Sequence, residues 1–332
     1  MTTNISLAPL LQSFFTDRLI RQKQVSSHTI GSYRDTFRLL LQFLAKRLRK
    51  TPSQMLLEDL EAPLIVAFLD GLEKERGNGA RSRNLRLAAI HSFFRYASFE
   101  SPANAGQIQR VLAIPGKRHQ RSLVHFLTRP EAEALLGAPN LSKWSGRRDH
   151  ALMLLALQTG LRLSEITALR KEDVSLEAGA HVRVVGKGRK ERCTPLTKRT
   201  AAVLRAWLKE PAHKDSGLVF PSARGKRLSA DGVQYLLAKH VAVATAACPA
   251  LASKRVTPHV LRHTAAMELL QAGVDRSVIA LWLGHESVET TQIYLDASLA
   301  MKEKALQKTT FPNGKLRRYR PGDQLLAFLN GL

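Results

Sequence analysis

Residues 257–296 read TPHVLRHTAAMELLQAGVDRSVIALWLGHESVETTQIYLD, and this stretch sets the pattern for the second half of the chain. Thr257 is a suitable N-cap and Pro258 a suitable first residue for a helix over 258–272, which a glycine follows. A second helix is predicted over 275–283, and it too ends at a glycine. The stretch therefore predicts closely spaced helices on which polar side chains take defined positions.

Four of those polar side chains suit chemistry on an anion: His259, Arg262, His285 and Tyr294. His259 and Arg262 are three residues apart on one predicted helix, so they project from the same face. Attack on a phosphodiester builds negative charge on an already anionic phosphorus, and positioned cationic donors are the main requirement for catalysis. We interpret Tyr294 as a nucleophile for a DNA phosphate and the other three side chains as the groups that hold this phosphate.

A second arginine and a proton donor are found upstream. Arg162 begins a short predicted helix in LRLSEITALR, and the fork of an arginine donates two parallel hydrogen bonds to a phosphate. Lys187 lies between two glycines at the tip of a strand–turn–strand pattern over 181–196, from which it could reach DNA and protonate the departing 5′-oxygen. Tyrosine has a pKa of about 10, so cationic neighbours also lower the cost of forming the phenolate.

The charge of the chain favours a polyanionic partner. Lys and Arg number 51 against 27 Asp and Glu, which gives a net charge of +24 and a pI of about 10.7. Such a surface attracts nucleic acid, although charge alone also fits a basic protein that repulsion keeps in solution. Double-stranded DNA is therefore the expected partner.

Other bulk features exclude several classes of protein. Cys193 and Cys248 are too few for a disulfide framework or a four-ligand zinc site, and both are predicted to be small core residues. The N-terminus lacks the pattern of a secretory signal, and no apolar run reaches the ~18 residues that a membrane span needs. We expect a cytoplasmic protein with no membrane partner.

Residues 1–100 predict a helical domain. Apolar residues recur at three- and four-residue spacing over 7–20, 27–50, 58–75 and 80–98, with basic side chains on the outer faces. In the fourth helix the predicted inward stripe is Leu85, Ala89, Phe93 and Ala97, and the arginines outside it are Arg81, Arg83, Arg86 and Arg95. Each of these arginines suits either a solvated surface or a contact with DNA.

Residues 101–126 contain prolines, glycines and a basic run, and they are predicted to form an interdomain linker. The next segment, 127–305, predicts a mainly α domain with a small antiparallel β-sheet, an α+β architecture. Residues 306–332 form a tail with a basic loop and a short apolar helix, which either packs on its own domain or docks on another molecule.

The motifs, taken in their order, resemble those of one family. They are Thr159-Gly160-Leu161-Arg162-Leu163-Ser164-Glu165, Gly186-Lys187-Gly188, His259-Val260-Leu261-Arg262-His263, Leu283-Gly284-His285 and Tyr294. With them the chain resembles the tyrosine recombinases, the phage-integrase and Xer-like family of site-specific DNA recombinases, over 127–305 and more loosely over 7–98. The resemblance implies an N-terminal four-helix core-binding domain of the SAM-like type and a tyrosine-recombinase catalytic domain. The long tail is similar to that of members from mobile elements.

The resemblance also implies a role for each site residue. Arg162 and Arg262 would clamp the scissile phosphate. His259 would assist proton transfer and phosphate binding, and His285 would hydrogen-bond the same phosphate. Tyr294 would form a 3′-phosphotyrosyl link with the DNA.

Three further residues receive supporting parts from the same resemblance. Lys187 would be the general acid for the leaving 5′-oxygen, Glu165 would be a supporting acidic residue, and His263 is expected to pack rather than to catalyse. The family works as a tetramer on two DNA sites and exchanges strands through a four-way junction, with neither a metal nor a nucleotide cofactor. Its C-terminal segment often docks on a neighbouring protomer, and the tail of this chain could do so or could pack on its own domain.

Two other functions remain open from the sequence. An enzyme like the type IB topoisomerases would use the same cleavage chemistry without bringing two DNA sites together. A DNA-binding accessory protein of a mobile element would need none of the catalytic residues. Recombinant joints between two sites would indicate a recombinase, and relaxation alone would indicate the topoisomerase.

Because the chain is expected to neutralise many DNA phosphates, its affinity for duplex DNA should fall steeply with salt. For roughly six to ten phosphate contacts, the loss is about 10³- to 10⁵-fold between about 50 and 200 mM salt. Fluorescence-anisotropy titrations at several salt concentrations measure this slope. A flat response would contradict an electrostatic grip on the DNA backbone.

Overall fold

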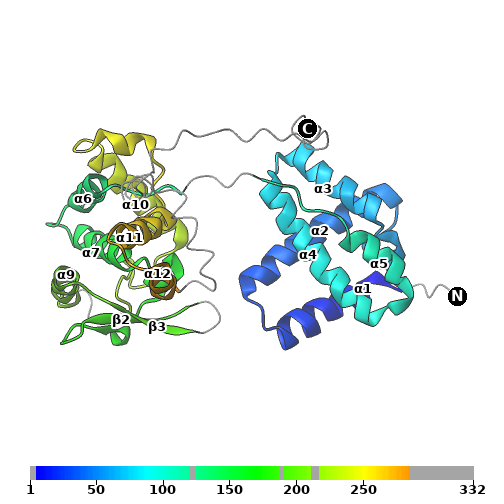
Figure 1. Cartoon of the computed structure of the whole chain (residues 1–332), viewed down its shortest axis with the longest axis horizontal. Coiled ribbons are helices and arrows are strands. Elements are labelled where there is room, and N and C mark those ends of the chain that lie inside the picture. The colour runs from blue at the N-terminus through cyan, green and yellow to red at the C-terminus, as the bar shows by residue number, and fades with distance from the viewer. Residues whose placement is uncertain (1–4, 120–123, 187–189, 211–216, 285–332) are drawn as a thin grey trace, which may run out of the picture. The chain divides into compact units, whose positions relative to one another are not determined.

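The computed structural model describes residues 5–119, 124–186, 190–210 and 217–284. The chain divides into two compact units, 1–121 and 122–332 (Figure 1). Both units are built mainly from helices, and the second also contains a small antiparallel sheet. The predicted fold class, mainly α with a small antiparallel sheet, is confirmed. Within the described ranges, no helix is both long enough and apolar enough to cross a membrane.

The described part of the N-terminal unit contains five α-helices joined by short turns. They are α1 (Leu7–Ser13), α2 (Ser27–Leu48), α3 (Ala62–Arg76), α4 (Ala80–Glu100) and α5 (Ala105–Leu112). A π-helical segment, Phe14–Gln22, continues α1, and short 3-10 turns lie at Pro52–Gln54, Leu57–Asp59 and Pro102–Asn104. Ser26 is the N-cap of α2, since its hydroxyl accepts a hydrogen bond from the backbone N–H of Thr29 at 3.3 Å.

The third helix begins later than the apolar spacing predicts. It was expected over 58–75, but α3 begins at Ala62, and the residues before it form a separate 3-10 turn. Pro63 lies in the first turn of α3. A proline is tolerated there because the first N–H groups of a helix have no intrahelical acceptor, and its fixed backbone angle favours the helix start. The predicted start is therefore wrong by about one turn.

Helix α4 buries three of the four residues predicted to face inward, Ala89, Phe93 and Ala97, but not the fourth. Phe93 is fully buried and packs edge-on against Phe14 and Phe37, at ring-centroid distances of 5.5 and 5.3 Å. Leu85, predicted to face inward, is 57% exposed, whereas Arg83, predicted to face outward, is 4% exposed. The buried face also includes Leu87, Ile90 and Phe94, and on a helix of about 3.6 residues per turn its centre lies near Arg83 and away from Leu85. The predictions for Leu85 and Arg83 are wrong for this reason.

The first part of the predicted linker, 101–126, is folded. Helix α5 buries Ile108 and Val111 in the core of the N-terminal unit. Beyond it, the side-chain amide of Asn84 donates to the backbone carbonyl of Lys117 at 2.7 Å, and the N–H of Lys117 donates back to the Asn84 side chain at 2.9 Å. The linker prediction is therefore wrong for the residues up to 117, which belong to the N-terminal unit.

The prolines and glycines of this segment led to the wrong prediction of a linker. Pro102 begins a 3-10 turn and Gly106 lies in the first turn of α5, two positions where these residues are compatible with helical structure. The buried Arg83 also ties this segment to the unit. It donates to the carbonyl of Pro115 at 3.4 Å, and its Nε lies 3.7 Å from the carboxylate of Glu73.

The described part of the second unit, 122–332, combines helices with a three-stranded sheet. Its helices are α6 (Arg129–Gly137), α7 (Trp144–Thr159), α8 (Leu163–Ala168), α9 (Lys198–Leu208), α10 (Ala230–Ala244), α11 (Pro258–Gln271) and α12 (Arg276–Leu283). Its strands are β1 (Val174–Ser175), β2 (His181–Val185) and β3 (Glu191–Pro195), paired antiparallel in the order β1-β2-β3. The predicted hairpin is β2–β3. Strand β1 was not predicted, because two residues are too few to display an alternating pattern.

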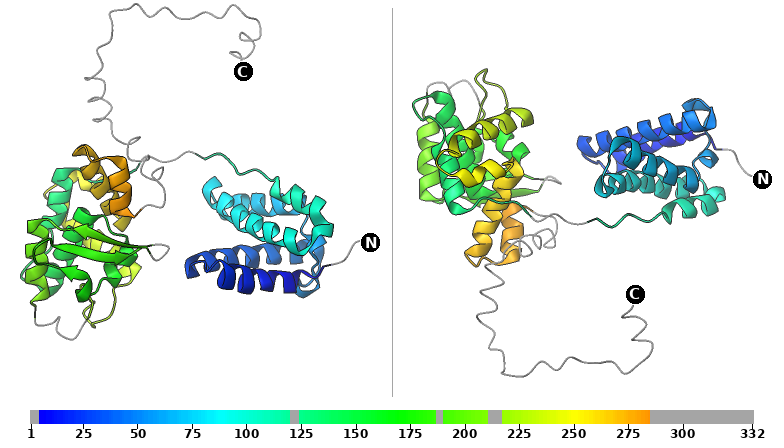
Figure 2. Two further views of the ribbon diagram at one scale, coloured as in Figure 1. Left: turned by 60° about the horizontal axis from the view of Figure 1, so that its bottom comes forward. Right: turned by 90° about the horizontal axis from the view of Figure 1, so that it is seen from above.

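Helix α7 lies at the centre of this unit. It is buried on most sides and packs against both α9 and α11, while the small sheet lies at the margin of the helical body (Figure 2). Gly160 ends α7 with a left-handed backbone, φ +63°, as its position in the sequence predicts. Thr257 caps α11 as predicted, since its hydroxyl accepts from the N–H of Val260 at 3.3 Å.

The register of the sheet places Cys193 on its outer face. Val182, Val184 and Thr194 are buried on the inner face, and Cys193, which precedes Thr194, is exposed. Successive side chains of a strand point to opposite faces, so neighbours along β3 differ in burial. The prediction that both cysteines are core residues is wrong for Cys193, whereas Cys248 is half-buried.

Replacing Ile108 by Ala tests whether α5 is an integral part of the N-terminal core. Because Ile108 is fully buried, the substitution should lower the free energy of unfolding of this unit by about 2–5 kcal/mol. The matched control is Ile20→Ala, since Ile20 is 51% exposed and its loss should cost within about 0.5 kcal/mol. Amide hydrogen exchange of peptides from α4 and α5 measures both effects, and equal effects would contradict the assignment.

Candidate active site

Three of the six predicted site residues lie in the described part of the chain. They are Arg162, His259 and Arg262. Lys187, His285 and Tyr294 lie outside the described residues, and so does the predicted docking tail, 306–332. The last described residue is Gly284, which directly precedes His285 in the sequence.

Arg162 lies at the N-cap position of α8, where a short helix was predicted to begin. Its backbone N–H donates to Glu165 Oε2 at 2.7 Å, so the carboxylate satisfies an N–H that the helix leaves without an intrahelical acceptor. Its side chain donates from Nη1 to Glu165 Oε1 at 3.1 Å and from Nη2 to the carbonyl of Gly284 at 2.7 Å. The two side-chain bonds hold the guanidinium between α8 and the end of α12.

Arg262 reaches the same helix end from α11. It is only 6% exposed, and it donates from Nη1 to the carbonyl of Gly160 at 2.6 Å and from Nη2 to the carbonyl of Leu283 at 2.7 Å. Arg162 and Arg262 therefore donate to two consecutive carbonyls, those of Leu283 and Gly284. Carbonyl groups at a helix C-terminus lack intrahelical donors and carry partial negative charge, so cations are stabilised there.

Two glycines permit this close approach. Gly160 and Gly284 both have left-handed backbones, with φ of +63° and +64°. A Cβ at Gly160 would lie 2.5 Å from the side chain of Leu283, and one at Gly284 would lie 2.9 Å from Nη1 of Arg192. A Cβ at either position would therefore require a neighbouring side chain to shift, and the left-handed backbone would be strained for any residue other than glycine.

Glu165 connects Arg162 to a further arginine. Arg192, on β3, donates from Nη1 to Glu165 Oε1 at 3.0 Å and from Nη2 to Glu165 Oε2 at 2.7 Å. Burial by itself would raise the pKa of Glu165, but the hydrogen bonds from Arg192 and from the backbone of Arg162, together with both positive charges, lower this pKa. The carboxylate is therefore ionised and lies between two guanidinium groups.

Sequence reasoning missed Arg192, and strand alternation could have found it. It occupies the inner face of β3, in register with Val184 of β2 and two residues from the buried Thr194. An arginine at a position that otherwise holds buried residues needs a partner of opposite charge. The β2–β3 pattern was recognised in the sequence, but the inward direction of Arg192 was not used.

The two histidines of α11 differ in their surroundings. His259 is exposed, whereas His263 is half-buried, and the centroids of their rings are 6.4 Å apart. Burial first, and then the charges of His259 and Arg262, lower the pKa of His263 to about 4. His263 is therefore neutral near pH 7, which agrees with its expected role in packing.

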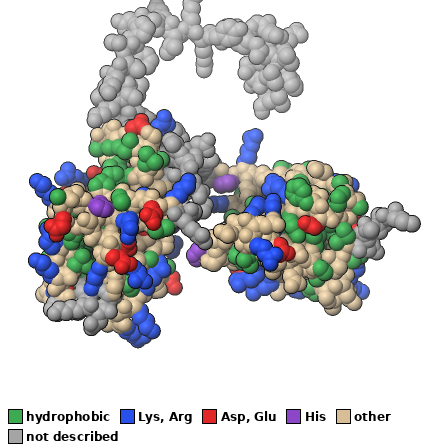
Figure 3. All heavy atoms as spheres, turned by 90° about the horizontal axis from the view of Figure 1, so that it is seen from below, with side chains coloured by type: hydrophobic (Ala, Val, Ile, Leu, Met, Phe, Trp, Pro, Cys, Tyr) green, Lys and Arg blue, Asp and Glu red, His purple; other side chains and the backbone are tan. Residues whose placement is uncertain are grey.

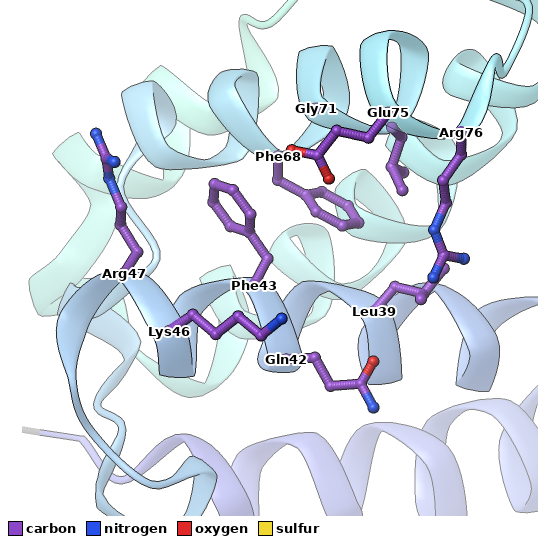
Figure 4. Close-up of a pocket in the computed structure, with 10 residues that line it drawn as sticks. Leu39, Gln42, Phe43, Lys46, Arg47, Phe68, Gly71, Glu75 and Arg76 are labelled. Carbon is purple, nitrogen blue, oxygen red and sulfur yellow. The ribbon is translucent and has the colours of Figure 1, made fainter.

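Elsewhere the described surface offers basic side chains but no metal site. Lys and Arg side chains are spread over the face that Figure 3 presents in both units. In the N-terminal unit, α2 and α3 line an open groove (Figure 4). Its lining includes Phe43 and Phe68 between the helices, the cationic Lys46, Arg47 and Arg76, and the acidic Glu75. Across the ranges that the structure describes, no three His, Cys, Asp or Glu side chains cluster so as to hold a metal ion.

Comparison with known proteins identifies the family. Residues 125–301 match the phage integrase family, and residues 13–100 match the N-terminal SAM-like domain of phage integrases. The tyrosine recombinase XerC of Chlamydia muridarum is 34% identical to this chain over 312 residues, which cover 87% of this chain and 94% of that protein. The chain belongs to the tyrosine recombinase family. It is a site-specific DNA recombinase.

Other similar proteins match most of the length of the recombinase. A Sinorhizobium fredii protein named "Putative integrase/recombinase y4rC" is 67% identical over 332 residues, which cover the whole of both chains. A crystal structure of XerH bound to a palindromic difH substrate has a TM-score of 0.66 at 21% identity, and covers 86% of the recombinase and 81% of that chain. A lambda integrase tetramer bound to a Holliday junction has a TM-score of 0.63 at 18% identity, with coverage of 95% and 82%. The two structures share the fold of the recombinase.

Acid should destabilise the second unit of the recombinase through His263. The pKa of this side chain is about 4 in the folded protein, below its ordinary value of 6.5, so the unfolded chain binds the proton more readily. The neutral form of His263 therefore favours the folded state in full above a pH of about 6.5. This part of the free energy of unfolding is lost as the pH falls toward about 4. A His263→Gln variant should therefore lose less free energy of unfolding between pH 6.5 and 4.5 than the parent protein.

Urea unfolding followed by tryptophan fluorescence measures this difference. The three tryptophans, Trp144, Trp207 and Trp282, all lie in the second unit, so the signal reports on that unit. An identical pH dependence in the parent and the variant would contradict the assignment of this titration to His263.

Proposed function

We propose that the recombinase cleaves and rejoins DNA strands through a covalent bond between Tyr294 and a 3′-phosphate. The observation that supports this most directly is the convergence of Arg162 and Arg262 on the last carbonyls of α12. Two guanidinium groups from distant parts of the sequence thus come together one residue before His285. Such an arrangement suits the binding of a phosphate that must accept further negative charge.

The proposed cleavage step conserves atoms and protons. The phenolic oxygen of Tyr294 attacks the phosphorus, the bond from phosphorus to the 5′-oxygen breaks, and a 3′-phosphotyrosyl link and a 5′-hydroxyl result. Arg162 and Arg262 stabilise the charge on the phosphate oxygens, and His285 donates a hydrogen bond to the same phosphate. His259 assists removal of the phenolic proton. Because the phosphotyrosine retains the energy of the broken link, attack by a 5′-hydroxyl reseals a strand without a nucleotide.

Lys187 is proposed as the general acid for the departing 5′-oxygen. The strands on either side of it support this role, since Val185 pairs with Glu191 and the N–H of Gly186 donates to the carbonyl of Lys190 at 2.8 Å. The hairpin is therefore closed directly before the segment 187–189. A lysine in that segment is carried by a paired scaffold rather than by a long loop.

Duplex DNA and further recombinase protomers are the proposed partners. The net charge of +24 favours a polyanion. Among the structurally similar proteins, XerH is bound to a difH substrate and lambda integrase forms a tetramer on a Holliday junction. We propose that this recombinase likewise acts as a tetramer on two DNA sites. The fold that it shares with these complexes supports that assembly.

The domain roles and the biological setting are part of the same proposal. We assign DNA binding to the core-binding domain, 1–100, catalysis to 127–305 and docking on a neighbouring protomer to the tail, 306–332. The matches of residues 13–100 and 125–301 to the two phage integrase models support the first two roles. A mobile element is the proposed setting, and the structural similarity to the integrase of the transposon Tn1549, with a TM-score of 0.64, supports it.

A nicked suicide substrate tests the nucleophile. On such a substrate the cleaved fragment diffuses away, so a covalent protein–DNA complex accumulates and is measured on a denaturing gel. The parent protein should form the complex, whereas Tyr294→Phe should bind the DNA but form none. A complex trapped by Tyr294→Phe would rule out Tyr294 as the attacking group.

The same assay separates phosphate stabilisation from DNA binding. Arg162→Ala or Arg262→Ala should lower the cleavage rate by roughly 10²-fold or more, while affinity for DNA falls much less. Losses of equal size in cleavage and binding would mean that the two arginines only contact the DNA backbone.

A further inference from the structure

Arg192 is held on all three of its side-chain nitrogens. Nη1 and Nη2 donate to the two oxygens of Glu165, and Nε donates to the carbonyl of Trp282 at 3.2 Å. The side chain is 12% exposed. A rigid, bidentate pair of this kind is selective for arginine, because the ammonium of a lysine cannot reproduce the fork.

Two glycines lie close to this guanidinium, one on each of two neighbouring elements. A Cβ at Gly186, at the base of the β2–β3 hairpin, would lie 3.0 Å from Nη1 of Arg192, and a Cβ at Gly284 would lie 2.9 Å from the same atom. Glycines at both positions therefore let the hairpin and the end of α12 approach one arginine. Arg192 thus joins three elements: the hairpin before 187–189, α8 with Arg162, and the last turn of α12.

The charges at this junction affect Arg162. The single negative charge of Glu165 is shared by two guanidinium groups, so the three side chains together carry one positive charge. If Arg192 were absent, Glu165 would pair with Arg162 alone, and the sum of their charges would be zero. A neutral pair would attract a phosphate less than a cation does, most of all in a partly buried site where charges are poorly screened.

We propose that Arg192 is a positioning residue for strand cleavage, which compensates Glu165 so that the charge of Arg162 remains available to the scissile phosphate. This inference rests on the proposed function. Arg192 acts through Glu165 and through the ends of the hairpin and α12, and it does not touch the DNA in this role. Its partner in the reaction is therefore the carboxylate of Glu165, whose charge it offsets.

The effect on Glu165 distinguishes this role from that of a purely structural ion pair. Burial raises the pKa of Glu165, and the hydrogen bonds and charge of Arg192 are the largest opposing influence. In an Arg192→Met variant the pKa of Glu165 should therefore rise. Protonation of Glu165 at lower pH would then release Arg162 from the neutral pair. A variant that had merely lost packing would show no such recovery.

The experiment measures single-turnover cleavage of the nicked suicide substrate at saturating protein, between pH 5.5 and 8. At neutral pH, Arg192→Met should cleave roughly 10- to 100-fold more slowly than the parent, a smaller loss than that of a direct phosphate donor. Its affinity for DNA should stay within about twofold of the parent. The ratio of its rate to that of the parent should rise as the pH falls. Adding Glu165→Gln to Arg192→Met should recover most of the lost rate and abolish the pH dependence of the ratio.

Matched controls keep the result interpretable. Arg183→Met removes an exposed arginine from β2 of the same hairpin, where it pairs with Asp173 at 3.5 Å, and should leave the cleavage rate unchanged. Arg192→Lys retains the positive charge and should keep a much larger part of the rate than Arg192→Met. Thermal unfolding by tryptophan fluorescence identifies any variant that does not fold. If Arg192→Met does not fold, the lysine variant and the double variant test the proposal.

Several outcomes would overturn the proposal. A rate ratio that does not change with pH, no recovery in the double variant, or a lysine variant as slow as the methionine variant would each show that Arg192 does not act by compensating Glu165. Failure of the proposed function is distinguishable from these outcomes. In that case the parent protein would form no covalent complex, or Tyr294→Phe would form one.

Discussion

Two guanidinium groups share the C-terminal turn of one short helix, and the other contacts of the site depend on this arrangement. The carbonyls of Leu283 and Gly284 have lone pairs that the helix does not use, and Arg162 and Arg262 donate to them from α8 and α11. Such a contact requires three helices to meet closely, and the absence of a Cβ at Gly160 leaves room for the side chain of Leu283 on α12. The arrangement of the two arginines therefore results from the packing of three helices, and it does not require contact with DNA.

Charge compensation is the second constraint. Bringing cations out of water is costly unless they are paired and hydrogen-bonded, yet full neutralisation would defeat the binding of a phosphate. The structure satisfies both conditions, because Glu165 lies between Arg162 and Arg192, and backbone carbonyls satisfy the remaining contacts. The same excess of positive charge recurs over the whole chain, whose net charge of +24 suits a protein that must hold a polyanion while its reactive centre stays ordered.

Local signals predicted much of the fold, and their failures have a common cause. The N-cap at Thr257 and the left-handed glycine that ends α7 were predicted because each depends on a few neighbouring residues. The orientation of Arg83 and the extent of the N-terminal unit through α5 were not predicted. These features depend on which apolar surfaces pack together in the folded unit, as Phe93 packs on Phe14 and Phe37, and local residue patterns do not encode that choice.

The sequence by itself determined the composition of the candidate site: the order of Arg162, Lys187, His259, Arg262, His285 and Tyr294 indicates the tyrosine recombinase chemistry, because phosphoryl transfer needs those residue types. Only the tertiary structure decided that Arg162 and Arg262 meet on one helix end and that Glu165 pairs with both Arg162 and Arg192. The physical reason is the range of the interactions. Residue chemistry and helix caps are local properties, whereas the direction of a side chain from a strand and the acceptor that it reaches depend on packing between elements about 100 residues apart.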